Sequence, residues 1–276
     1  MELRDIQFIF NRALSRVFCA KKLLSTFLIL LLCGIMIVFF RGISLQTGQW
    51  IALSLNFLPV FLCAGVLLAT GIILTRIYHD EIKKKETSYR KIINNSWDVI
   101  IGAGYLAVPV ILIYLLLWML LGVFFLLNDI PGLGHLFSVV LSFGPFLLNL
   151  GAIILCVFSI SMLFVITPII ALRGINRIQL AQTFAKRFHE NLFYNIVLGI
   201  IAMVPFWFVF TLLSISAAMT GQICETCGTP LYTIMQWFFV MIPFTAALTP
   251  AVIFFFNFAA ESHVLLLKAP RRSVGL

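Results

Sequence analysis

Six long apolar runs limit what this sequence can fold into. A transmembrane helix needs about 20 mostly apolar residues, and the runs that meet or nearly meet this length are about 23–40, 52–74, 99–127, 145–172, 192–219 and 231–260. They lack the alternation of apolar and polar residues that marks an outer-membrane barrel. We therefore predict an all-α, polytopic membrane protein: six transmembrane helices arranged as three helical hairpins, in a single integral membrane domain over residues 1–276.

The fourth and first runs need further interpretation: where the fourth span begins, and whether the first run is a span or a signal peptide. The apolar stretch around the fourth run begins at Leu136 and is too long for one straight span, so we expect 136–143 to be an outer interfacial piece. The first run follows 22 residues, and "IMIVFFRGISLQ" at its end has no small-x-small cleavage site. We therefore interpret the first run as a retained span rather than a signal peptide.

The basic residues predict an orientation. If the segments alternate between the two sides, 18 of the 19 Lys and Arg residues fall on one side, and only Arg41 falls on the other. Basic residues accumulate on the cytoplasmic side of membrane proteins, so both termini are expected in the cytoplasm. The same rule explains the net charge of +9 without a nucleic-acid partner.

Three related units are suggested along the chain. The segments 88–112 and 183–208 each have a basic stretch, an Asn-containing turn, an apolar run and then Val-Pro. The segment "ALSRVFCAKKLLSTFLILLLC" (13–33) has a similar outline without the proline. We interpret these as parallel repeats. Pro59, Pro145 and Pro243 are expected in the first helical turn of their spans, where proline is tolerated, whereas Pro109 and Pro205 are expected to kink theirs.

Each unit is expected to begin with a basic amphipathic helix lying in the headgroup layer. The arm at 1–22, for example, has an apolar stripe flanked by arginines: Ile6, Ile9, Phe10, Ala13, Leu14 and Val17. Segments 82–101 and 175–193 have the same pattern, which is typical of interfacial helices. Anionic headgroups are the predicted partners of Lys83, Lys84, Lys85, Arg90, Lys91, Arg177, Lys186 and Arg187. The alternative is that these stretches extend the spanning helices into water.

The segment "VITPIIALRGINRIQLAQTFAKRFHENLFYNIVLGIIAMVP" (165–205) resembles the YciC-like family of bacterial inner-membrane proteins, which is similar to the membrane portion of some glycerophosphodiester phosphodiesterases. "RIYHDEIKKKETSYRKIINNSWDV" (76–99) resembles the earlier cytoplasmic segment of that family. The resemblance implies a six-span protein of the inner membrane. It supplies no catalytic residue, because its motifs are patterns of layout.

Few residues in the spans carry chemistry. The span interiors contain no Asp, Glu, Lys, Arg or His, which argues against proton-coupled transport. His189 with Glu190, and Glu261 with His263, are expected to be polar boundary residues beside Arg and Lys. A cytoplasmic acid–base site is the alternative. Intramembrane polar contacts between helices, or a polar cavity, are expected at Asn149, Asn257, Thr245 and Thr249. We predict no catalytic, cofactor or metal site.

Cys224 and Cys227 form the one C-x-x-C pair, in the predicted third outer loop. We expect a local disulfide, since the outside of the cytoplasmic membrane is oxidising. An inert reduced pair, a redox-active pair and a metal site are the alternatives. The sequence favours a non-enzymatic protein that organises the envelope or binds lipid, membrane proteins or cytoplasmic proteins. A permease or channel for a small or lipidic molecule, and a membrane thiol oxidoreductase using this pair, are the other hypotheses.

Overall fold

The structure is a computed structural model, and it describes residues 3–84, 89–128, 143–173, 192–220 and 230–268. In these ranges the chain forms helices and no strand, which confirms the predicted fold class. The helices are α1 (Leu3–Ser15), α2 (Ala20–Ser44), α3 (Gln49–Ile82), α4 (Tyr89–Asn128), α6 (Phe143–Arg173), α8 (Leu192–Met219) and α9 (Pro230–Lys268). All but α1 are long and apolar enough to cross a membrane. The chain is therefore an all-helical, multi-pass membrane protein.

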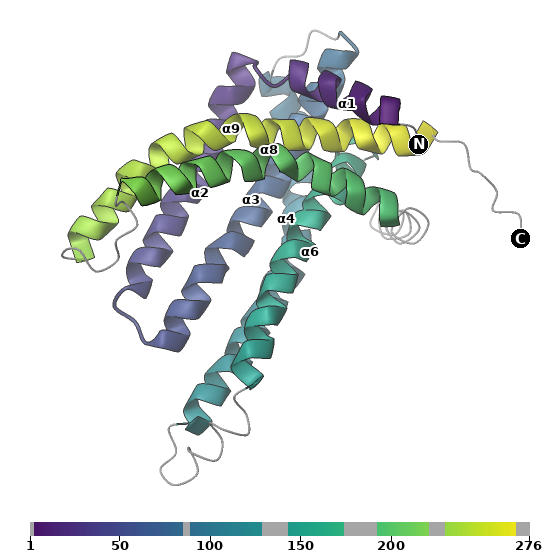
Figure 1. Cartoon of the computed structure of the whole chain (residues 1–276). Helices are drawn as coiled ribbons and strands as arrows, with labels where there is room; N and C mark the ends of the chain where they lie inside the picture. Colours follow the sequence, from purple (N-terminus) through teal and green to yellow (C-terminus); the bar gives the residue numbers. More distant parts are fainter. Residues whose placement is uncertain (1–2, 85–88, 129–142, 174–191, 221–229, 269–276) are drawn as a thin grey trace, which may run out of the picture.

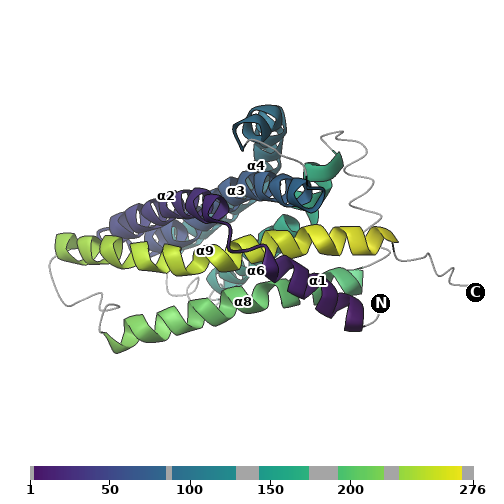
Figure 2. The same ribbon diagram turned by 90° about the horizontal axis from the view of Figure 1, so that it is seen from above.

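Helix α9 is the centre of the packing. It lies against α1, α2, α3, α6 and α8, while α3 joins α2 to α4 and α6. Figures 1 and 2 show α9 running beside α8 across the upper part of the bundle, with α1 lying along its C-terminal half. The segment 251–263 of α9 is buried at every residue. A helix that is apolar on all sides is covered by other helices or by lipid; "AVIFFFNFAA" has that composition, and here other helices enclose it.

Glycines allow α9 to approach its neighbours closely. A Cβ added to Gly34 of α2 would lie 2.3 Å from the Sδ of Met241, and one added to Gly71 of α3 would lie 2.2 Å from Cε1 of Phe256. Small residues at such positions let helix backbones pack closely in membranes. The absence of side chains at these two positions therefore sets the spacing of α2 and α3 from α9.

The prolines divide into two groups. Pro145 lies in the first turn of α6, as predicted, and Pro109 and Pro205 lie inside α4 and α8. Pro59 and Pro243, however, lie well inside α3 and α9, so the prediction that they occupy the first turn is wrong. Each helix begins about three turns before its proline. The polar residues Gln49 of α3 and Thr233 of α9 are therefore already helical. Figure 1 shows α9 bent along its length, as expected of a helix with internal prolines.

The basic stretch before the third span is not a separate helix where the structure describes it. Residues 89–101 are the first part of α4, which continues without interruption through its span. The alternative of a simple helix extension therefore holds for this segment. The corresponding stretch at 175–193 lies almost wholly outside the described residues, and so does 136–142. The repeat remains a prediction.

Candidate functional site: a polar network at the basic end

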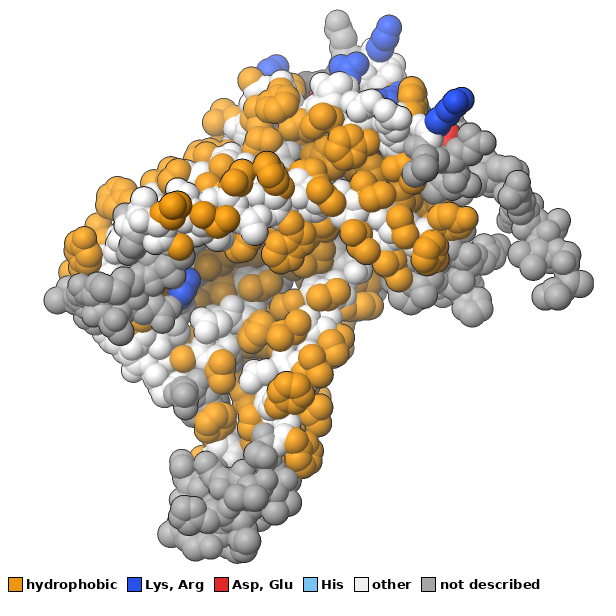
Figure 3. All heavy atoms as spheres, in the orientation of Figure 1, with side chains coloured by type: hydrophobic (Ala, Val, Ile, Leu, Met, Phe, Trp, Pro, Cys, Tyr) orange, Lys and Arg blue, Asp and Glu red, His pale blue; other side chains and the backbone are white. Residues whose placement is uncertain are grey.

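One end of the bundle carries exposed positive charge. The N-terminus of α2 and the C-terminus of α3 meet there, and α1 lies beside them. We call this the basic end; its exposed described cations are Arg4, Arg16, Lys21, Lys83 and Lys84. In Figure 3 Lys and Arg side chains lie mainly along the upper edge, whereas the visible sides of the spans are largely apolar. Such a surface has a charged end and a broad apolar belt.

Helix α1 is held to α9 by its apolar stripe. Ile9, Ala13 and Val17 are at most 3% exposed. The ring of Phe10 lies edge-on to Phe254, with their centroids 4.9 Å apart. The stripe was predicted to face lipid, and for Ile9, Ala13 and Val17 this is wrong, because protein covers them; Leu14 of the same stripe is 44% exposed. Hydrophobic periodicity identifies the face that is buried but not the material that buries it.

Two polar residues of α9 also contact α1. Asn257 is fully buried, and its Nδ2 donates to the carbonyl of Ala13, 3.4 Å away, in the last turn of α1. The carbonyls of the last helical turn have no N–H partner within the helix, and Asn257 provides a donor for one of them. Glu261 lies one turn further along α9. Its Oε1 is 3.4 Å from Nε of Arg12 and accepts a hydrogen bond of 2.8 Å from the hydroxyl of Tyr78.

Lys22 extends this network to α2. Its side chain is fully buried, and its ammonium lies 2.5 Å from Oε2 of Glu81 and 5.5 Å from the centre of the Tyr78 ring. Tyr78 therefore contacts an anion through its hydroxyl and a cation through its ring face. Arg12, Lys22, Tyr78, Glu81 and Glu261 form one network that ties together α1, α2, α3 and α9. We call it the polar network.

The polar network pairs its charges internally. Two cations, Arg12 and Lys22, face two carboxylates, Glu81 and Glu261. Burial of an ion is tolerated when it is paired and hydrogen-bonded, so this arrangement stabilises a fixed packing of four helices. Glu261 and His263 are only 6% and 2% exposed. Both side chains are therefore covered by protein, and Glu261 lies beside Arg12, in keeping with the predicted polar residues beside Arg and Lys; their place at the membrane boundary stays a prediction.

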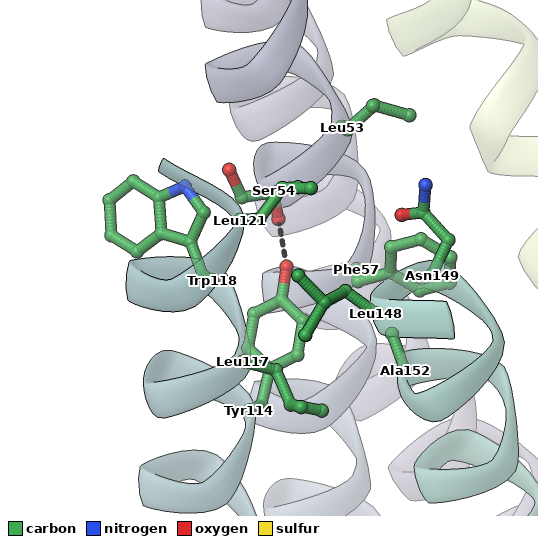
Figure 4. A pocket seen from close by; sticks show the side chains of 10 residues that line it. All are labelled: Leu53, Ser54, Phe57, Tyr114, Leu117, Trp118, Leu121, Leu148, Asn149 and Ala152. Carbon is green, nitrogen blue, oxygen red and sulfur yellow. Dashed lines mark hydrogen bonds between the residues drawn. The ribbon is translucent and has the colours of Figure 1, made fainter. Parts of the chain in front are cut away.

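Asn149 borders a small pocket between α3, α4 and α6 (Figure 4). The pocket has a volume of about 20 Å³, and Tyr114 on its wall donates a 2.6 Å hydrogen bond to the carbonyl of Ser54. A second pocket between the same helices has a volume of about 40 Å³ and a mainly apolar lining. Volumes of this size hold about one to three water molecules. These two pockets are too small for a solute.

Thr245 and Thr249 form hydrogen bonds within α9. Their hydroxyls donate to the carbonyls of Ile242 and Thr245, three and four residues earlier in the same helix. Thr245 nevertheless faces α2, because its Cγ2 would lie 3.3 Å from a Cβ on Gly34. Of the four predicted intramembrane contacts, only Asn257 thus makes a described hydrogen bond to another helix.

The other predicted site residues are placed only in part. Lys83 and Lys84 follow α3 and are exposed at the basic end. Arg90 and Lys91 lie in the first turn of α4, and their side chains are not described. The remaining ones lie outside the described residues: Lys85, Arg177, Lys186, Arg187, His189, Glu190, Cys224 and Cys227. Cys19, Cys33, Cys63 and Cys156 are reduced cysteines outside any disulfide, and the described part of the chain shows no cluster of three His, Cys, Asp or Glu side chains suited to a metal.

Four members of the polar network were not predicted from the sequence as site residues: Arg12, Lys22, Tyr78 and Glu81. Lys21 and Lys22 are adjacent and look equivalent, yet one is exposed and the other fully buried, because successive helical residues point about 100° apart. The sequence did contain one indication of the site. Tyr78 and Glu81 are three residues apart, a spacing that puts them on one face of a helix. Comparison of the chain with protein-family models, curated proteins and solved structures finds no match.

Proposed function

We propose that this chain is a non-enzymatic protein of the bacterial inner membrane, of the YciC-like type, that binds anionic phospholipid at its basic end. In this proposal the basic end faces the cytoplasm, and the protein serves the organisation of the envelope. The observation that carries the proposal is the division of charge at the basic end. Lys22, which is buried, and Arg12, which is 40% exposed, face carboxylates, and five further cations are exposed at the same end: Arg4, Arg16, Lys21, Lys83 and Lys84.

Exposed cations at the end of a membrane bundle lie close to lipid phosphates. Each Lys or Arg near an anionic leaflet contributes about 1 kcal/mol to the attraction. The basic end is also rigid enough to hold these charges in a fixed pattern, since four helices are joined beneath it by the polar network. Both features favour a surface that selects lipids by charge.

The packing favours binding over transport. The pockets beside α3, α4 and α6 have room for water molecules and not for a solute. The 251–263 segment of α9 is enclosed by other helices and is apolar over most of its length. A permease needs a site that a solute can enter from either side, and such a site is the alternative outcome of the test below.

The test is the thermal unfolding of purified protein in neutral detergent, with added phosphatidylglycerol or phosphatidylcholine. A lipid that binds the folded state at 100 times its dissociation constant stabilises that state by about 2.7 kcal/mol. We expect phosphatidylglycerol to raise the unfolding temperature by several degrees and phosphatidylcholine to raise it less. The difference should shrink at high salt, because exposed charges are screened.

A matched pair of variants localises the effect. K83Q with K84Q removes two charges from the basic end, and R41Q removes one from the opposite end of α2, where Arg41 lies over the ring of Trp237. Only the first should reduce the preference for phosphatidylglycerol. Equal stabilisation by both lipids would contradict the proposal, and solute uptake by reconstituted vesicles would favour the permease. Reporter fusions at residues 130 and 225 should read external, and a cytoplasmic signal at either would reverse the proposed orientation.

A further inference from the structure

The outer face of α1 is the most unusual exposed surface at the basic end. Phe8 is 64% exposed and Phe18 is 74% exposed, although the other face of the same segment is packed against α9. Leu14, at the edge of the covered face, is 44% exposed. Arg4, Arg16 and Lys21 are exposed around these apolar side chains. The segment thus has one apolar face that protein covers, and its exposed side carries single apolar side chains among polar and basic ones, which include Gln7, Asn11 and Ser15.

The chain fixes Phe18 in its outward position. Val17 donates its amide to the carbonyl of Leu14 at 3.1 Å, and Cys19 donates to the carbonyl of Val17 at 2.9 Å. Helix α2 begins at Ala20, with Cys19 as its N-cap. Val17 is 1% exposed inside this turn, so Phe18 is held on the outside next to the first residue of a transmembrane helix.

We propose that Phe8 and Phe18 insert into the headgroup layer of the adjoining leaflet, while Arg4, Arg16 and Lys21 bind the phosphates of anionic lipids there. This inference rests on the proposed function and names the site that carries it. Aromatic side chains favour the membrane–water boundary, and apolar side chains bordered by Lys and Arg match an anionic interface in both polarity and charge. Asp5 is the one acidic side chain of the described part of α1, so that helix keeps a net positive charge.

Contacts with α9 determine how α1 presents this side. Glu261 of the polar network pairs with Arg12, Asn257 donates to the carbonyl of Ala13, and the Phe10 ring lies against Phe254. These contacts use the inner side of α1 and prevent rotation about its axis. The outer residues therefore stay exposed as a preformed site, which reduces the ordering needed for lipid binding.

The test replaces Phe8 or Phe18, one at a time, by the photoreactive residue benzoylphenylalanine in the full chain. Cells are irradiated, and the adducts on the purified protein are identified by mass spectrometry. We expect phospholipid adducts at both positions. The control position is Met119 of α4, which is 69% exposed on a span and should react with lipid chains regardless of headgroup.

Headgroup selectivity is measured as the ratio of phosphatidylglycerol to phosphatidylethanolamine adducts at position 18 relative to position 119. R16Q or K21Q should lower this ratio up to about fivefold each. A ratio equal to that at Met119 would overturn the anionic site. Adducts to another protein, or water-quenched probes without adducts, would overturn the insertion of α1. In either case the thermal preference of the whole protein for phosphatidylglycerol could persist, so failure of this site is distinct from failure of the proposed function.

Discussion

The replacement of Gly71 by Ala tests the packing of α3 against α9. The new Cβ would lie 2.2 Å from Cε1 and 2.7 Å from Cδ1 of Phe256. Phe256 is 1% exposed and is surrounded by buried residues, so its ring has no space to rotate away. Insertion of a methyl group into a filled core costs about 1–3 kcal/mol. Alanine is better than glycine in a helix by about 0.8–1.0 kcal/mol, so the expected net loss is about 0–2 kcal/mol, whereas a site with free space would show a gain.

Gly104 provides the matched control. It lies inside α4, is exposed, and has no atom within 4 Å of an added Cβ. G104A should therefore gain the helix-propensity term alone and be stabilised by up to about 1 kcal/mol. The assay is reversible unfolding in mixed micelles, with helicity followed by circular dichroism. If G71A were as stable as G104A, α3 would not approach α9 at this position, and the central place of α9 would be refuted.

The polar network leads to two further predictions, measured by the same unfolding assay. Y78F should lose about 1.5–3 kcal/mol, because it removes a hydrogen bond to the buried carboxylate of Glu261; no loss would show that Glu261 does not depend on Tyr78. K22M should cost about 1–3 kcal/mol, less than a fully buried pair because the Glu81 side chain is 25% exposed, while K21M at the exposed neighbour should stay within about 0.5 kcal/mol. Equal effects of K21M and K22M would remove Lys22 from the network.

The helices could be predicted from the sequence because the signal is local. A run of about 20 apolar residues has few stable alternatives in a membrane, and the six predicted spans agree with six described helices to within a few residues at most ends. The largest differences are extensions into polar sequence. Helix α4 begins at Tyr89 rather than at 99, α3 continues past the predicted end at 74 to Ile82, and α9 continues past 260 to Lys268. The polar residues in the extensions of α3 and α9 are stabilised by contacts that hydropathy does not measure.

The candidate site could not be predicted because it depends on contacts between distant residues. Tyr78 and Glu261 are 183 positions apart, and Asn257 and Ala13 are 244 apart. The sequence identified Asn257 as costly to leave unpaired and Glu261 as ionisable, but not their partners. The apolar stripe of α1 was predicted correctly, but lipid was predicted to cover it, whereas most of it packs against protein. The sequence does not distinguish the two because protein interiors and lipid tails are equally apolar. Phe8 and Phe18 were overlooked since they lie outside that stripe.

A double-mutant cycle on Arg12 and Glu261 tests most directly whether the polar network docks α1 on α9. The variants are R12M, E261Q and the double variant; the amide introduced by E261Q retains an oxygen that can accept from Tyr78 while losing the charge that faces Arg12. The Arg12 side chain is 40% exposed and that of Glu261 is 8% exposed, so a coupling energy of about 0.5–1 kcal/mol is predicted. Hydrogen exchange of α1 should accelerate equally in both single variants and no further in the double variant. Additive stability losses, or α1 amides unchanged in E261Q, would contradict the account.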